Sequence, residues 1–307
     1  MRLIKPSFSI IKQQAGEIGM YKHIETCGRV AWKSEERTTL DSHIKFLEML
    51  KGVNHGSVLE HGTVYLKVKW YSLLTILFFF LNKYSKVKSW RYITTNYRVI
   101  VDNKKQKVMK YMVEPTEFHE KRATVNFICD RGVSHEYVRH RVFSFTQEST
   151  RYCNYTNEKF GNEITFIYPV WLKQYKDFVD GLVDLANKNN KKVYALGHDK
   201  SQPMEYRGLC SFIYDMSNSE HGYNFQISAG WKPQQARAIL PNALKTELIM
   251  TGFESDWVHF LKLRCPKSAH PQARELAMPL CYELVDSFDN IRRNIDLKSL
   301  NLEDMHS

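Results

Sequence analysis

Residues 139–152 read RHRVFSFTQESTRY, and this stretch is the most informative part of the chain. Three arginines and a histidine are interleaved there with serine, threonine and glutamine. A guanidinium group is a planar donor fork that suits phosphate, carboxylate and uracil-like carbonyl groups. The stretch therefore predicts a polar pocket for an anionic ligand. Two alternatives are a solvated basic strand and an RNA-binding patch with Phe143, Phe145 and Tyr152 as stacking faces. The small polar residues between the arginines disfavour both.

Nucleophilic catalysis by this stretch is disfavoured. Neither Ser144 nor Ser149 stands in a G-x-S-x-G motif, and no acid–base partner is evident near them. Nearby arginines could lower the pKa of Cys153, but a packed thiol is the simpler interpretation. We therefore expect hydrogen-bonding serines and a buried cysteine.

The composition is that of a folded chain with an excess of positive charge. The chain has 307 residues, of which 43% are hydrophobic and 13% aromatic, which excludes a disordered chain. The formal net charge of +11 indicates anionic partners without naming them. Nucleic acid, an anionic membrane surface and phosphorylated small molecules all remain open on charge alone.

Several classes of protein are disfavoured because their sequence motifs are missing. The six cysteines form no C-x-x-C pair, so we expect reduced thiols and no metal site. The N-terminus lacks the apolar region of a signal peptide, and neither a Walker loop nor a G-x-G-x-x-G motif occurs. The longest apolar run, residues 72–81, is about half of what a spanning helix needs. We interpret it as a buried strand or a partner surface.

Periodicity predicts strands followed by helices, which is typical of an α+β fold. Helix caps and stops are expected at Asp41 or Ser42, Ser134, Gly230 and Pro233, with a kink at Pro279. The expected strands are residues 3–11, 63–70, 92–101, 123–129 and 164–169. The expected helices are residues 42–50, a short one near 134, 177–188, 204–228, 257–263 and 273–291.

Four segments together resemble the signatures of the flavin-dependent thymidylate synthases. R-H-R-x-x-S followed by Q-E-S-T-R-Y, in residues 139–152, is the longest of them. Residues 54–61 (NHGSVLEH), 235–241 (QARAILP) and 260–270 (FLKLR with Ala269-His270) are similar to three further motifs of that family, in the same order. The resemblance covers about residues 20–70 and 122–290, which is most of the chain.

The resemblance implies a function and an architecture. Members convert dUMP to dTMP by reductive methylation, with 5,10-methylenetetrahydrofolate as the carbon donor, FAD as the hydride source and NADPH as the reductant of the flavin. It also implies an α+β fold, with an antiparallel or mixed sheet flanked by helices, and a cytoplasmic homotetramer with shared active sites. We expect one domain over residues 1–307 with an insertion at about 71–121, and no nucleic-acid or membrane partner.

The resemblance also assigns roles to single residues. Arg264 would face the uracil ring and His55 the flavin, and these are the candidate catalytic residues. The dUMP-binding residues would be Glu136, Arg139, Gln147, Glu148, Ser149, Thr150, Arg151, Arg237 and Arg264, with Arg151 on the 5′-phosphate. FAD would contact Ser57, Glu60, Arg139, His140, Arg141, Gln147 and His259.

Two features depart from the family pattern. Phe253 and Ser255 stand where some members have Asn and Arg that contact FAD, and the insertion lengthens the chain between two motifs. Two other functions also stay open, namely a nucleic-acid-binding protein and a flavoprotein that methylates uracil within RNA. Much of the lysine, in residues 83–122 and 188–200, is not explained by nucleotide chemistry and is expected on solvated surface.

Overall fold

The computed structural model describes residues 1–52 and 56–297. Contacts divide the chain into two compact units, which are described separately. The first comprises residues 1–7, 128–136 and 149–246, and the second comprises residues 8–127, 137–148 and 247–307. The expected single domain and its insertion stay predictions.

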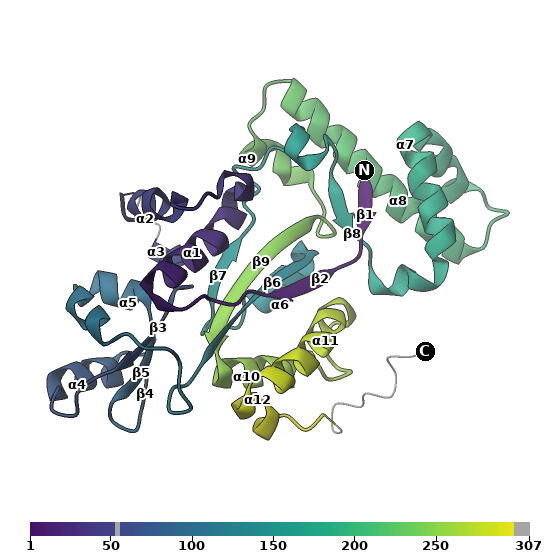
Figure 1. Ribbon diagram of the computed structural model, residues 1–307. Helices are drawn as coiled ribbons and strands as arrows, with labels where there is room; N and C mark the ends of the chain where they lie inside the picture. Colours follow the sequence, from purple (N-terminus) through teal and green to yellow (C-terminus); the bar gives the residue numbers. More distant parts are fainter. Residues whose placement is uncertain (53–55, 298–307) are drawn as a thin grey trace. The chain divides into compact units, whose positions relative to one another are not determined.

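The first unit is mainly helical. Its two long helices, α7 (Lys176–His198) and α8 (Met204–Ser228), pack side by side (Figure 1). Strand β1 (Arg2–Ile4) pairs in parallel with β8 (Thr165–Ile167). Its other helices are α6 (Arg131–Tyr137, whose last residue belongs to the second unit), α9 (Pro233–Ala236) and the 3₁₀ helices η4 (Glu158–Phe160), η5 (Val170–Tyr175) and η6 (Arg237–Ile239).

The core of the first unit fixes the chain's first residue. The amino group of Met1 lies 2.8 Å from a carboxylate oxygen of Glu220 and donates to Asn187 Oδ1 at 2.8 Å. Glu220 also accepts from the backbone N–H of Ile164 at 2.7 Å. Because both charges of this pair are buried, these hydrogen bonds offset their loss of hydration.

The second unit contains most of a four-stranded sheet, in the order β2-β6-β9-β7. Strands β7 and β9 are antiparallel, with Ser144 opposite Thr251 and Gln147 opposite Leu248. These strands are β2 (Ser7–Ile10), β6 (Arg122–Asp130), β7 (Ser144–Gln147) and β9 (Lys245–Phe253). The helices that follow β9 are α10 (Glu254–Arg264), α11 (Pro271–Ser287) and α12 (Asp289–Asn294).

A three-stranded antiparallel sheet, in the order β3-β5-β4, forms the other part of the second unit. Two of its strands, β4 and β5, lie within residues 71–121. The strands are β3 (Thr63–Lys67), β4 (Lys86–Lys88) and β5 (Tyr92–Asn96). The accompanying helices are α1 (Gly16–Arg29), α2 (Ser42–Gly52), α3 (Gly56–Leu59), α4 (Leu73–Leu81) and α5 (Tyr97–Asp102).

The α+β class and the mixture of parallel and antiparallel pairing are confirmed. Helix α8 has the predicted bounds, and Pro233 begins α9 as predicted. Gly230 has a φ of +90°, the left-handed conformation typical of a residue that follows a helix end. The six cysteines are buried and free of disulfides. No helix in the described ranges is both long and apolar enough to cross a membrane.

Four sequence predictions of structure are wrong. Residues 73–81 form a helix rather than a buried strand, because an apolar run without alternation does not distinguish the two. The predicted strand 92–101 ends at Asn96, whose side chain accepts from Val99 N–H at 3.0 Å and caps α5. Asp130, not Ser134, caps α6, since its Oδ1 accepts from Val133 N–H at 2.7 Å. Helix α11 ends at Ser287, and α12 follows from Asp289.

The prediction that strands come first and helices later is also incomplete. Strand β9 lies late in the chain, and helix α1 lies early. All of β9 except its first residue is buried, so its side chains show no alternation between polar and apolar positions. Periodicity therefore does not predict β9. It does not predict α1 either, because the buried face of α1 mixes apolar and charged residues.

Candidate functional site

An aromatic cluster in the second unit positions the R-H-R segment. The Tyr137 and Phe260 rings lie 4.9 Å apart in an edge-to-face arrangement, and Phe143 packs on Trp257 at 4.7 Å. The Tyr137 hydroxyl also donates to the backbone carbonyl of Ala273 at 2.8 Å. The segment that leads from α6 to β7 is therefore held on helices α10 and α11 by large buried rings.

His140 is buried within this cluster, whereas Arg139 and Arg141 on either side of it are exposed. The His140 ring lies 5.0 Å from the Phe260 ring and 6.0 Å from the His259 ring. Turns fix this segment, because the backbone N–H of His140 donates to the Tyr137 carbonyl at 3.1 Å and that of Phe143 donates to the His140 carbonyl at 3.1 Å. Two exposed arginines thus flank a buried histidine in the sequence.

Arg264, at the end of α10, contacts the same histidine. Its Nε donates to His140 Nε2 over 3.0 Å. An imidazole nitrogen accepts only when it carries no proton, so this contact requires the proton of neutral His140 to lie on Nδ1. The structure therefore brings together His140 and Arg264, which lie 124 residues apart in two motifs, and His259, which directly precedes the second motif.

The end of β7 carries Gln147 and Glu148. Glu148 is buried, and its backbone N–H donates to the carbonyl of Glu247 at 2.9 Å. Gln147 lies opposite Leu248 in the β7–β9 ladder. Both residues are therefore fixed by backbone pairing with β9, the strand that also leads into α10.

A second group of predicted residues lies in the first unit. The Arg237 guanidinium donates from Nη1 to the hydroxyl of Thr150 at 2.9 Å, which joins two residues 87 positions apart. Ser149 Oγ accepts from the Arg151 backbone N–H at 3.3 Å. The Arg151 side chain is exposed and lies 5.5 Å from the Tyr152 ring. Glu136, also in this unit, lies near the end of α6. The arginine side chains are thus available to an anionic ligand in a preformed hydroxyl-rich turn.

The histidine segment is described only in part. His55 lies outside the described residues. Ser57 is exposed in α3, and Glu60 is half-buried and paired with Arg98 at 2.6 Å. Arg98 also pairs with Asp102 at 3.0 Å. The Glu60 carboxylate therefore already has a cationic partner from the expected insertion.

Phe253 and Ser255, the two departures from the family pattern, are both engaged within the protein. The Phe253 ring lies 5.5 Å from the guanidinium carbon of Arg122 and 5.7 Å from Lys86 Nζ. The Ser255 hydroxyl donates to Glu120 at 2.5 Å. Both positions therefore contribute to packing and hydrogen bonding of the protein itself.

A buried chain of hydrogen bonds links two histidines whose roles the sequence did not reveal. His61 contacts Thr251 through Nδ1 at 2.7 Å and Thr146 through Nε2 at 2.9 Å. Thr124 bridges Thr251 at 2.8 Å and His23 Nε2 at 3.1 Å. In the sequence, His61 ends the histidine segment, and the three threonines stand in three different strands. Their hydrogen bonds become apparent only once the pairing of these strands is known.

Burial keeps these histidines neutral. Loss of hydration lowers the pKa of His23 to about 4, with a smaller effect from the Arg122 charge. The pKa of His61 is also lowered well below its ordinary value, first by burial and then by His23 and Arg122. Near neutral pH this network of histidines and threonines is therefore uncharged, and its hydroxyl and imidazole groups hydrogen-bond to one another.

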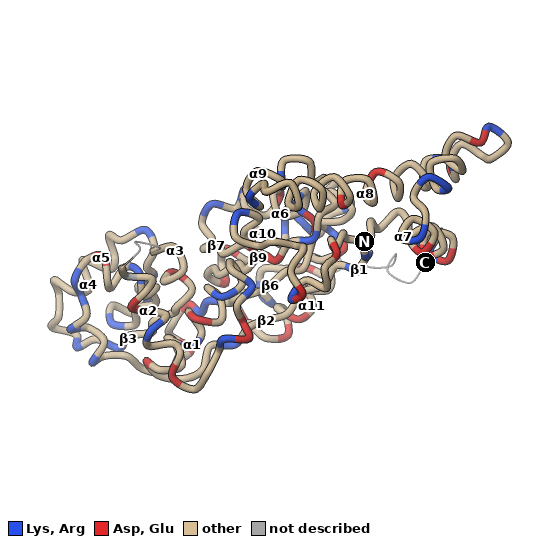
Figure 2. Tube along the Cα trace, turned by 90° about the horizontal axis from the view of Figure 1, so that it is seen from above, with Lys and Arg blue, Asp and Glu red and all other residues tan. Residues whose placement is uncertain are grey.

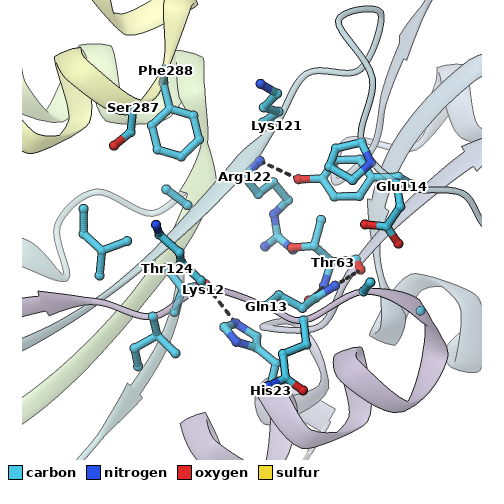
Figure 3. A pocket seen from close by; sticks show the side chains of 18 of the residues that line it. Lys12, Gln13, His23, Thr63, Glu114, Lys121, Arg122, Thr124, Ser287 and Phe288 are labelled. Atoms are coloured by element: carbon cyan, nitrogen blue, oxygen red, sulfur yellow. Dashed lines mark hydrogen bonds between the residues drawn. The ribbon is translucent and has the colours of Figure 1, made fainter.

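A cavity of about 450 Å³ opens beside this network (Figure 3). Its lining includes Lys12, His23, Lys121 and Arg122, and none of the family-derived site residues. Burial lowers the pKa of Arg122 to about 10, and its Nη1 donates to the Glu60 carbonyl at 3.0 Å and to Thr63 Oγ1 at 3.3 Å. The cavity is thus basic, and it is formed by a part of the second unit that the motifs do not mark.

Comparison with known proteins identifies the family. The model of the family described as "Thymidylate synthase complementing protein" matches residues 83–288, about two thirds of the chain, so the chain belongs to that family. The match begins within the expected insertion and ends in the loop after α11.

Named relatives are flavin-dependent thymidylate synthases. The Pyrococcus furiosus enzyme is 29% identical over 164 residues, which are 53% of this chain and 54% of that protein. The Mycobacteroides abscessus enzyme is 26% identical over 170 residues, 55% of this chain and 60% of that protein. The chain therefore aligns with little more than half the length of these relatives.

One solved structure is similar over most of both chains. It is the UMP/dUMP methylase PolB from Streptomyces cacaoi bound with 5-Br dUMP, with 13% identity, 96% coverage of each chain and a TM-score of 0.44.

Proposed function

We propose that the protein is a flavin-dependent thymidylate synthase that methylates dUMP to dTMP. The carbon donor would be 5,10-methylenetetrahydrofolate, and NADPH would reduce the flavin. The observation that carries the proposal is the hydrogen bond between Arg264 and His140, because it joins two family motifs that are distant in sequence. The family match and the named relatives support the same chemistry.

The side chains of the R-H-R segment fit a flavin dinucleotide. Arg139 and Arg141 are exposed guanidinium groups suited to a pyrophosphate, and buried His140 fixes the segment between them. The exposed Ser57 hydroxyl would be a further hydrogen-bond donor to FAD. The Glu60 carboxylate forms an ion pair with Arg98. His259 would lie on the flavin side, and Gln147 would contact both ligands. FAD, when bound and reduced by NADPH, would supply the hydride of the reaction.

The dUMP phosphate would be held by arginines of the Q-E-S-T-R-Y and A-R-x-x-L-P motifs. Arg151 would bind the 5′-phosphate with Ser149 beside it, and Arg237, whose Nη1 donates to the Thr150 hydroxyl, would bind the same nucleotide. Charge-assisted hydrogen bonds to phosphate are about twice as strong as neutral ones, so two arginines can provide most of the affinity. Glu136, Glu148 and the other members of the predicted set would contact the ribose and base.

Arg264 would act on the uracil ring. A fixed cation there stabilises negative charge on the N3–C2–O2 group, which makes C5 of the base nucleophilic without a covalent bond to the enzyme. The contact with His140 orients the guanidinium, because it commits Nε to one direction. His55 would serve as the second catalytic residue beside the flavin. A cytoplasmic homotetramer with shared sites completes the proposal.

Release of tritium from 5-tritiated dUMP tests the function. We expect release only when methylenetetrahydrofolate, FAD and NADPH are present together, and omission of each one gives the matched control. No release with all components present contradicts the proposal. Release from 5-tritiated uracil in RNA, but not from dUMP, would instead identify an RNA-modifying enzyme. Reconstitution with FAD, followed by absorbance, checks the flavin site separately.

A further inference from the structure

Helix α4 exposes an apolar stripe. Its sequence, LLTILFFFL, is apolar except for Thr75, yet only Ile76 and Phe79 are buried in the core of the second unit. The exposed positions recur at helical spacing and therefore share one face. More than half of each side chain on this face is accessible, with Leu74 at 86%, and its members are Leu73, Leu74, Leu77, Phe80 and Leu81.

Exposed aromatic residues accompany the helix. Trp70 and Tyr71 precede it, with their rings edge to face at 5.7 Å. Trp90 lies in the turn between β4 and β5 and is 78% exposed. Both Ser89 and Trp90 have positive φ values, of 48° and 58°, which are unfavourable for a bulky residue. The turn thus holds a tryptophan in solvent at a conformational cost.

The same part of the chain carries nearly all of the net charge. Residues 67–110 contain eleven lysines and arginines against Asp102 alone, a net +10 of the chain's +11. Figure 2 shows basic positions in β3 and α5 and beside α4, whose own residues carry no charge. Lys69 lies 5.6 Å from the Tyr71 ring, Lys83 lies 4.8 Å from Tyr84, and Lys105 lies 4.8 Å from Phe78 of α4. Cations therefore flank the apolar stripe at both ends and along its side.

We propose that this face, the α4 stripe with Trp70, Tyr71 and Trp90, binds the surface of an anionic phospholipid membrane. Leucine and phenylalanine would enter the boundary of the acyl chains, aromatic rings would lie at headgroup depth, and lysines would contact anionic headgroups. The nine residues of α4 are about 14 Å long, less than half of the ~30 Å hydrocarbon core, so the helix lies on the bilayer and does not cross it.

The charge of this face favours an anionic membrane over two other partners, a second copy of the chain and nucleic acid. A second copy of the chain would bring two strongly basic surfaces together, and like charges oppose that contact. Nucleic acid would match the lysines but would leave the leucine stripe in water. An anionic bilayer matches both features. The inference departs from the sequence-based expectation that the protein has no membrane partner, and it does not depend on the proposed reaction.

The test is co-sedimentation of the full chain with vesicles. One set contains phosphatidylcholine alone, and the other contains a phosphatidylcholine–phosphatidylglycerol mixture. Leu74→Gln removes apolar contact, and Leu40→Gln is its matched control, since Leu40 is 79% exposed elsewhere. Lys83→Gln removes a flanking charge, and Lys188→Gln, an exposed lysine of α7, is the control. Thermal unfolding of each variant confirms that the fold is kept.

We expect the wild type to bind anionic but not neutral vesicles, and added salt to weaken that binding. Leu74→Gln should weaken partitioning about tenfold, and Lys83→Gln about fivefold. The two control variants should bind like the wild type. Absence of binding to anionic vesicles, or equal binding by Leu74→Gln, would overturn the proposal. So would a dimer in light scattering that Leu74→Gln abolishes, or capture of single-stranded DNA in place of vesicles.

Discussion

Replacement of Arg264 by alanine tests the contact on which the proposed function rests. The change removes the donor at 3.0 Å from His140 Nε2 and the cation proposed to face the uracil ring. Arg264 is half-buried, so the lost hydrogen bond should cost about 1 kcal/mol of folding free energy. Loss of a fixed group that stabilises developing negative charge should lower turnover by about 10² to 10³, or roughly 3–4 kcal/mol in the barrier. The catalytic effect should therefore exceed the effect on stability.

The assay is tritium release from 5-tritiated dUMP, with thermal unfolding of each variant measured in parallel. Arg264→Lys keeps the charge but lacks the planar donor fork, so we expect partial activity. Lys262→Ala is the matched control, because Lys262 is an exposed cation in the same last turn of α10. It should lose no more than about 1 kcal/mol of stability and keep its turnover. Turnover of Arg264→Ala within about threefold of the wild type would refute the proposed role on the ring.

Three further predictions concern the phosphate group and the buried network. Arg151→Ala should raise KM for dUMP by about 10- to 100-fold through loss of a charged hydrogen bond, and unchanged KM would argue against phosphate binding there. His61→Ala should lower the free energy of unfolding in urea by about 3 kcal/mol, because the hydroxyls of Thr146 and Thr251 each lose a buried partner. Since the folded-state pKa of His23 is about 4, below its ordinary 6.5, unfolding binds a proton between these values, and stability should fall as pH decreases from 6.5 to 4. The slope should approach ~1.4 kcal/mol per pH unit and be smaller in His23→Gln, and an identical pH dependence in both proteins would contradict it.

The sequence could predict what depends on local pattern. Helix α8 was predictable because its periodicity, Gly230 and Pro233 mark both the helix and its end. Strand β9 was not, because a strand buried on both faces shows no alternation. For the candidate site, the motifs supplied the arginines and histidines, but not their pairing. The His140–Arg264 contact depends on how large aromatic rings pack between distant segments, and no local rule contains that information.

Residue types alone define the chemical groups that this protein offers: three clustered arginines beside serine and threonine hydroxyls, an excess of positive charge and the motifs of one family. The positions and contacts of these groups follow from long-range packing. In the folded chain the apolar residues 73–81 form a helix with one face in solvent, and buried threonines link His61 to His23 by hydrogen bonds. The physical reason is that side-chain type fixes what a group can bind, whereas burial and long-range packing fix its charge state, its partners and its access to solvent.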